Sequence, residues 1–239
     1  MTTSLAIIAL LFISAFAPAQ ARAGVWDDLA SPVTTPARTV LIIGTGLTIG
    51  LIILEDQLVD PAQQATVEDR PLGSFSKVGD YGGQLVPNAA YVAGMLVAGA
   101  FNNRKAFHRA GVMTLATAYS AGITTGLKYA VREPRPNNGA DRKSFPSGHA
   151  TTAFAFSAVV GAEHGWDWGI PAYLLAALVA YSRMNDNKHY VHDVVAGATI
   201  GTAYGLGVHY VRRGRGSSRF SFTPYWEKQR KGLTVAFRL

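Results

Sequence analysis

Apolar residues dominate six segments of this chain, at about residues 39–54, 86–101, 106–131, 147–163, 169–182 and 189–211. Each run is long enough for a helix, and recurring small residues permit close packing between helices. Segment 39–54 has no charged residue but is shorter than the roughly 20 residues that an upright membrane span needs. The pattern therefore predicts an all-α bundle of about six helices, embedded in a membrane.

The segments outside this bundle have different patterns. Residues 1–23 combine an apolar core, Leu5 to Phe16, with small residues after it, which predicts an export signal or an uncleaved N-terminal anchor. Residues 24–38 are expected to form a loop or a short surface helix. Residues 55–85 form a polar connection, and its Gly-rich part, 74–83, is expected near the functional site.

The end of the chain, residues 212–239, is a basic tail. Around residues 220–222 and 233–239 apolar and polar residues alternate with period two, and the charged segment Glu227–Gly232 separates the two runs. This alternation predicts a short β-hairpin. The expected organisation is thus a leader or anchor at 1–23, a helical domain at 24–211 and the tail.

Composition supports a membrane setting. Of the 239 residues, 49% are hydrophobic and 15% charged, against about 25% charged in an average soluble domain. The chain has no cysteine, which excludes disulfides and thiolate metal sites. The formal net charge is +7, but the basic residues gather at loop ends instead of along one helix face. Anionic phospholipids and phosphorylated substrates explain this charge better than nucleic acid does.

Three polar clusters interrupt the apolar sequence between residues 128 and 193. They are KYAVREPRP, with Lys128 and Arg135, then FPSGHA, with Ser147, Gly148 and His149, and finally SRMNDNKHYVHD, with Arg183, His189 and Asp193. Up-down connectivity brings all three to one end of a bundle. The opposite end then carries seven other basic residues: Arg104, Lys105, Arg109, Arg212, Arg213, Arg215 and Arg219.

The three cations of these clusters suit a ligand with several negative oxygens, because a guanidinium fork matches the geometry of a phosphate. Ser147 and Gly148 open an apolar run. If that run is a helix, its free N–H groups and partial positive charge also favour an anion. The clusters therefore predict a phosphate-binding site without a metal ion or other cofactor.

The histidines supply the reactive groups. His189 and Asp193 are four residues apart, so on a helix they share one face, and the carboxylate holds one imidazole nitrogen. The other nitrogen is then free to attack phosphorus. His149 lies beside the anion site, where it can protonate a leaving oxygen. His192 is a rival by composition, but it adjoins Asp193 and adjacent helix positions do not face each other. It receives no catalytic role.

The pattern Lys-x6-Arg-Pro, Pro-Ser-Gly-His and Ser-Arg-x5-His-x3-Asp resembles the signature of the type-2 phosphatidic acid phosphatase superfamily, which includes vanadium-dependent haloperoxidases. The membrane lipid phosphatases are the expected branch. The resemblance is specific for residues 128–193 and looser over about 39–211. It implies that His189 is the nucleophile, Asp193 orients it and His149 is the general acid. It also implies that phosphate binds to Lys128, Arg135, Ser147, Gly148 and Arg183.

The expected function is therefore hydrolysis of phosphate monoesters or terminal diphosphates of membrane lipids, such as phosphatidic acid, undecaprenyl diphosphate or lipid A, through a phosphohistidine. A soluble periplasmic acid phosphatase acting on small phosphomonoesters is the first alternative. A vanadate-dependent haloperoxidase is the second. Nucleic acid is not an expected partner.

The expected location is the bacterial inner membrane, with the site facing the periplasm because the opposite end is basic. A periplasmic location is the alternative. A cleaved leader followed by three spans would instead place the site inside. Either residues 1–23 are not a simple cleaved signal, or one apolar segment does not cross the membrane.

Overall fold

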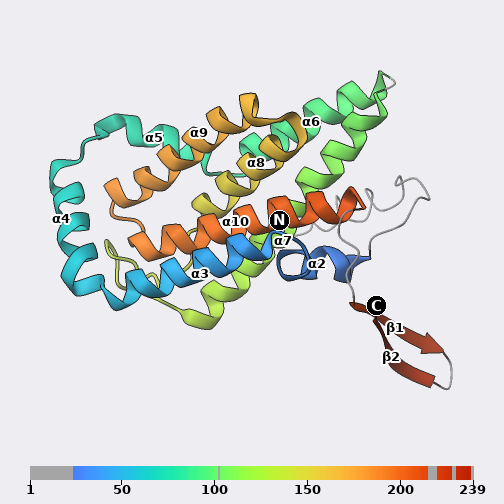
Figure 1. Ribbon diagram of the computed structural model, residues 1–239. Helices are drawn as coiled ribbons and strands as arrows, with labels where there is room; N and C mark the ends of the chain where they lie inside the picture. Colours follow the sequence, from blue (N-terminus) through green and yellow to red (C-terminus); the bar gives the residue numbers. More distant parts are fainter. Residues whose placement is uncertain (1–23, 102, 215–219, 228–229, 238–239) are drawn as a thin grey trace.

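The computed structural model describes residues 24–101, 103–214, 220–227 and 230–237; the expected leader at 1–23 lies outside them. Helices account for most of the described chain (Figure 1). The α-helices are α2 (Val25–Thr34), α3 (Arg38–Ile53), α4 (Asp60–Asp69), α5 (Ser76–Gly82), α6 (Val86–Ala100), α7 (Arg104–Val131), α8 (Gly148–His164), α9 (Trp166–Asn185) and α10 (Val191–Arg212). A π-helical turn, η1, spans Glu55–Val59, and a 3₁₀ turn, η2, spans Gly73–Phe75.

The all-α prediction is confirmed, but the expected number of about six helices is wrong. The described residues form nine α-helices, because α2, α4 and α5 arise in segments without a long apolar run. Helix α4 begins with a proline in its first turn, where proline costs no intrahelical hydrogen bond. Helix α5 is held by packing against α9, since Gly79 lies against Ser182. Tertiary contacts stabilise these short helices more than their own sequence does.

Helix α10 is the centre of the bundle. It packs against α2, α3, α7 and α8, while α9 packs on α8 and α6 packs on α7 (Figure 1). The main apolar core lies between α7, α8 and α10. It contains Val112, Met113, Ala116, Val159, Val160, Tyr204 and Val208, all buried. Helices α8 and α10, whose first turns carry the second and third polar clusters, are therefore packed against several other helices.

Two glycines of α10 let the backbones of α8 and α10 approach closely. A Cβ atom built on Gly201 would lie 2.2 Å from the carbonyl oxygen of Thr151, and one on Gly197 would lie 2.4 Å from that of Ser147. Any larger residue would therefore push the two helices apart. The close approach fixes the start of α8 relative to the start of α10, where the second and third polar clusters lie.

Large apolar side chains cover the outside of the bundle. Helix α3 exposes Ile42, Ile43, Leu47, Ile49, Ile52 and Ile53, with Ile42 69% and Ile53 72% exposed. By length and apolar composition, one described helix is able to cross a membrane, α10, and it is mostly buried. Helices α2 and α3 pass the same test as a pair, with a bend of 63° between them, and α6 is a shorter apolar helix.

The tail contains two strands, β1 (Phe220–Glu227) and β2 (Arg230–Phe237). They pair antiparallel, with Phe220 opposite Phe237 and Glu227 opposite Arg230. These strands lie outside the helical bundle that builds the site (Figure 1).

Candidate active site

The predicted nucleophile lies in the short connection between α9 and α10, with its ring 2% exposed. His189 Nδ1 is 3.3 Å from Asp193 Oδ2, and His189 Nε2 is 3.1 Å from Nη1 of Arg135. A carboxylate only accepts hydrogen bonds and a guanidinium only donates them. The contacts therefore assign the proton to Nδ1 and leave the lone pair on Nε2.

Asp193 is buried and held by several donors. Its Oδ2 accepts hydrogen bonds from the backbone N–H of Tyr190 at 2.9 Å and from the hydroxyl of Ser144 at 2.6 Å. Asp193 is the third residue of α10, so its carboxylate caps the helix N-terminus that it belongs to. These bonds fix the carboxylate that orients the His189 ring.

Burial lowers the pKa of His189 to about 4, although Asp193 acts in the opposite direction. Removal from water disfavours the charged imidazolium more than the nearby carboxylate favours it. The ring is thus neutral at neutral pH. A neutral ring is the form that a nucleophilic attack from Nε2 requires.

The first cluster surrounds this histidine with cations. Arg135 donates from Nε to Asp141 at 2.7 Å and from Nη1 to the carbonyl of Lys188 at 3.0 Å, which fixes the guanidinium plane. Lys128, in the last turn of α7, donates to the carbonyls of Lys143 and Ser144 at 2.7 and 3.1 Å. It therefore supports the same loop that carries the Asp193 partner Ser144.

The second cluster forms the N-terminus of α8, as expected. Ser147 is the N-cap residue, and its backbone N–H donates to the carbonyl of Asp193 at 2.9 Å. Gly148 follows as the first helical residue, and a Cβ built there would lie 3.9 Å from Cε of Lys128. The free N–H groups of α8 and the Lys128 side chain are thus neighbours.

The third cation, Arg183, and His149 meet through a residue that the sequence did not single out. Asp80 of α5 pairs with Nη1 of Arg183, and its Oδ1 lies 3.7 Å from Nε2 of His149. The Arg183 side chain is 5% exposed, while that of Asp80 is 47% exposed. His149 is also close enough to Arg183 and His189 to interact with them electrostatically.

The structure therefore brings the eight candidate residues into two contiguous groups at one end of the bundle. One group contains Lys128, Arg135, Ser147, Gly148, His189 and Asp193, and the other contains His149 and Arg183. The Gly-rich segment lies against the second group, because a Cβ on Gly83 would meet the His149 side chain at 2.7 Å.

Sequence reasoning missed Ser144, Asp80 and Glu133. Ser144 lies between the first two clusters and shows no helical period, so only its position three residues before Ser147 marks it. Asp80 is more than 100 residues from its partner Arg183. Glu133, within the first cluster, contacts His192 Nε2 at 3.0 Å.

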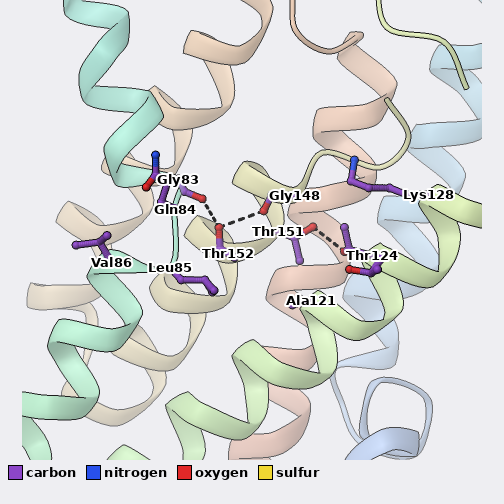
Figure 2. A pocket seen from close by; sticks show the side chains of 11 residues that line it. Gly83, Gln84, Leu85, Val86, Ala121, Thr124, Lys128, Gly148, Thr151 and Thr152 are labelled. Atoms are coloured by element: carbon purple, nitrogen blue, oxygen red, sulfur yellow. Dashed lines mark hydrogen bonds between the residues drawn. The ribbon is translucent and has the colours of Figure 1, made fainter. Parts of the chain in front are cut away.

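A cavity of about 470 Å³ opens beside the anion site (Figure 2). Its lining comes from α7, the start of α8 and the connection before α6, and comprises Gly83, Gln84, Leu85, Val86, Ala121, Thr124, Thr125, Lys128, Gly148, Thr151 and Thr152. Figure 2 shows Lys128 and Gly148 among the lining residues and a hydrogen bond between Thr124 and Thr151. The two hydroxyl oxygens of this bond are 3.0 Å apart. The cavity is mainly apolar, so it is suited to the organic part of a phosphate ester.

Two known proteins are similar to parts of this chain. Over 138 residues it is 33% identical to a lipid A 1-phosphatase of Porphyromonas gingivalis, an alignment that covers 56% of this chain and 30% of that protein. The chain thus spans about a third of that relative's length. The structure is also similar to the crystal structure of a transmembrane PAP2 type phosphatidylglycerolphosphate phosphatase from Bacillus subtilis. The alignment covers 77% of this chain and 95% of the Bacillus chain, with 21% sequence identity and a TM-score of 0.49.

The PAP2 superfamily model matches residues 109–217. This segment runs from α7 to beyond the end of α10 and contains all eight candidate site residues. The resemblance based on the three clusters is therefore confirmed, and residues 109–217 carry the PAP2 superfamily signature.

Proposed function

We propose that this protein hydrolyses phosphate monoesters or terminal diphosphates of membrane lipids through a phosphohistidine at His189. The observation that carries the proposal is the buried His189 ring, held by Asp193 at Nδ1 and in contact with Arg135 at Nε2. An imidazole oriented in this way is an activated nucleophile next to a cation that binds its target. Simple phosphate binding requires no such orientation.

In the proposed reaction, Lys128, Arg135, Arg183 and the N–H groups at the start of α8 bind the phosphoryl oxygens. His189 Nε2 attacks phosphorus as the bond to the leaving oxygen breaks, and Asp193 stabilises the charge that develops on the ring. His149 protonates the leaving oxygen. It then removes a proton from the water that cleaves the phosphohistidine and releases inorganic phosphate. The fixed cations stabilise the equatorial oxygens, which is the largest catalytic contribution expected.

Binding of phosphate requires Asp80 to give up its contacts. A carboxylate paired with Arg183 and close to His149 is where a negative phosphoryl oxygen would bind. Asp80 is half exposed, so it can turn towards water when an anion with more charge arrives. We therefore infer that Asp80 competes with the substrate for Arg183.

The cavity beside Lys128 supports a lipid as the organic part. Its apolar lining suits alkyl or isoprenoid groups, and the hydroxyl of Thr125 suits the polar atoms next to the phosphate. The similarity to a lipid A 1-phosphatase favours lipid A among the lipid substrates. Phosphatidic acid and undecaprenyl diphosphate remain within the same class.

Membrane residence is supported by the outer surface of the bundle. Helix α3 exposes an isoleucine-rich face, and the end of the bundle away from the site exposes Phe101, Trp166 and Trp168. Aromatic rings gather at membrane interfaces. Arg104 and Lys105 are exposed at the same end. By the positive-inside tendency, this supports a cytoplasmic position for that end and a periplasmic position for the site.

Two arginines expected to strengthen this charge bias have other partners. Arg109 lies 3.6 Å from Glu163, and Arg212 pairs with the buried Asp28. Their charges are therefore neutralised within the bundle. Arg104, Lys105 and Arg213 are exposed and contribute the bias among the described residues of this end.

The test is phosphate release by the purified full chain from lipid A, phosphatidic acid, undecaprenyl diphosphate and p-nitrophenyl phosphate. The expected result is turnover of at least one lipid well above p-nitrophenyl phosphate, and none with His189→Ala. A preference for p-nitrophenyl phosphate, together with release of the protein from membranes by carbonate, would favour the soluble acid phosphatase. Wild-type rates in His189→Ala would end the proposal.

A further inference from the structure

Three side chains of the types that ligate metals converge behind the His189–Asp193 pair. Glu133 reaches them from the connection between α7 and α8, whereas His192 and Asp193 lie in the first turn of α10. One ligand atom of each lies within 4.8 Å of the others. His192 Nε2 is 3.0 Å from Glu133 Oε1 and 3.8 Å from Asp193 Oδ1.

Two carboxylate oxygens of this cluster have no hydrogen-bond donor. Asp193 Oδ1 and Glu133 Oε2 are both buried and unpartnered, and Asp193 as a whole is fully buried. Buried polar atoms nearly always have a partner, because leaving one without costs about 1–3 kcal/mol and more for a charged group. Two carboxylates with unpaired oxygens beside one imidazole therefore form a donor set that a cation would satisfy.

The donor set suits a zinc-type ion. Zinc binds imidazole nitrogen and carboxylate oxygen at about 2.0–2.2 Å, which places tetrahedral ligand atoms about 3.4 Å apart. The two distances from His192 Nε2, 3.0 and 3.8 Å, lie on either side of this value. An imidazole ligand disfavours Mg²⁺ and Ca²⁺, which prefer oxygen. The Glu133 side chain is 24% exposed and offers a route from solvent.

We propose that Glu133, His192 and Asp193 bind one divalent cation of the zinc type, and that this cation inhibits the enzyme. Asp193 is the link, since its Oδ1 faces the cluster while its Oδ2 orients His189. A cation on Oδ1 withdraws negative charge from the carboxylate that must stabilise the His189 imidazolium during attack. It therefore lowers kcat and leaves substrate binding to Arg135 and Arg183 in place.

A proton competes with the cation for Nε2 of His192. As an imidazolium, His192 would donate from Nε2 to Glu133 and from Nδ1 towards Glu55, whose Oε1 lies 3.6 Å away. Cation binding needs the Nε2 lone pair, so it displaces that proton to solvent. The imidazolium form is the result to expect if no cation binds.

The experiment measures Zn²⁺ binding to the full-length protein after removal of any affinity tag and chelator treatment. Equilibrium dialysis with elemental detection gives the stoichiometry and affinity for the wild type, Glu133→Gln, His192→Asn and Glu55→Gln. Glu55→Gln is the matched control, because it changes a carboxylate next to His192 without removing one of the three ligands. Circular dichroism checks that each variant folds.

The expected result is one high-affinity Zn²⁺ per wild-type chain, retained in Glu55→Gln and weakened at least about 10-fold in Glu133→Gln and His192→Asn. Failure of the wild type to bind, or equal binding by all four proteins, would overturn the site. This binding result does not depend on the proposed function.

The inhibitory effect rests on the proposed function and has its own readout. Zn²⁺ is expected to lower kcat of the wild type at constant KM, and Glu133→Gln is expected to keep its zinc-free rate at the same Zn²⁺ concentration. Binding of Zn²⁺ without any loss of kcat would keep the site and refute inhibition. Absence of phosphatase activity without zinc would instead count against the proposed function alone.

Discussion

At the residue scale, the site depends on one imidazole whose two nitrogens have different partners. Asp193 accepts from Nδ1, and Arg135 donates to Nε2. Ser144 donates to the same carboxylate oxygen as the ring does. Each of these bonds has a defined direction, so the tautomer and the orientation of His189 follow from the donors and acceptors around it.

The low pKa of His189 leads to a direct prediction. Burial lowers this pKa to about 4 from the usual 6.5, so the ring is neutral throughout the physiological range. Titration of ¹⁵N-labelled histidine by NMR, with His189→Asn to assign the signal, is expected to show a midpoint near 4. A midpoint near 6.5 would mean that the ring is not buried as described.

The same shift links stability to pH. The unfolded chain takes up this proton near pH 6.5 and the folded chain only near 4, so the unfolded state binds more protons between these values. The contribution of His189 to stability is therefore complete above about pH 6.5 and is lost as the pH falls towards 4.

Arg135 is expected to contribute to catalysis through both its charge and its position beside His189. Arg135→Ala removes a donor aimed at the reacting oxygens, and a loss of about 2.7–4 kcal/mol in kcat/KM follows from comparable oxyanion donors. This corresponds to roughly a 10²- to 10³-fold decrease. Arg142→Ala, an exposed cation of the same loop, is the control and should change kcat/KM little. Equal decreases in kcat/KM for the two substitutions would mean that the overall positive charge of the loop matters, and not the position of Arg135.

At the element scale, the start of α8 is held against the start of α10. The backbone bond from Ser147 to Asp193 and the glycines of α10 bring the anion site and the nucleophile together. Helix α5 closes the other side, where Asp80 meets Arg183. The active geometry is thus a property of helix packing as well as of the eight side chains.

The packing of α8 on α10 is tested by Gly201→Ala. The new Cβ would lie 2.2 Å from the Thr151 carbonyl, so the helices must separate, at about 1–3 kcal/mol. We expect a lower thermal unfolding midpoint and at least about a tenfold loss of kcat, because the anion site shifts relative to His189. Gly126→Ala in α7 meets nothing within 4 Å and should be neutral or stabilising. Similar midpoints for both variants would contradict the close packing.

If Asp80 competes with the substrate for Arg183, removing its charge should improve phosphate binding. Asp80→Asn keeps the size of the side chain but removes the charge that pairs with Arg183. We expect tighter binding of inorganic phosphate and a lower KM for substrate, measured by product inhibition and initial rates. Weaker phosphate binding in this variant would mean that Asp80 organises Arg183 instead of competing for it.

At the scale of the whole molecule, the sequence predicted the main helices and the convergence of the three clusters. Runs such as 106–131 and 189–211 have a strong apolar pattern, and motif spacing marked Lys128, Arg135 and His189. The short helices α4 and α5 lack such a pattern, since contacts far along the chain stabilise them. The pairing of Asp80 with Arg183 was not predictable for the same reason.

His192 shows the same limit of local reasoning. Because it adjoins Asp193, it receives no catalytic role as a rival nucleophile from the sequence alone. The spacing gave no sign that Glu133, almost 60 residues earlier, would contact its ring. The cluster behind the nucleophile becomes visible only when the connection after α7 packs on the first turn of α10.

The central claim is that His189 itself receives the phosphoryl group, and the most direct test is to trap it. The full-length protein is mixed with a lipid substrate carrying labelled terminal phosphate, quenched in base during turnover, and mapped by mass spectrometry. Acid-labile phosphate on His189, absent from His189→Ala, is the predicted result. Steady turnover with no phosphorylated histidine, or with the label on His149 or His192, would contradict the account.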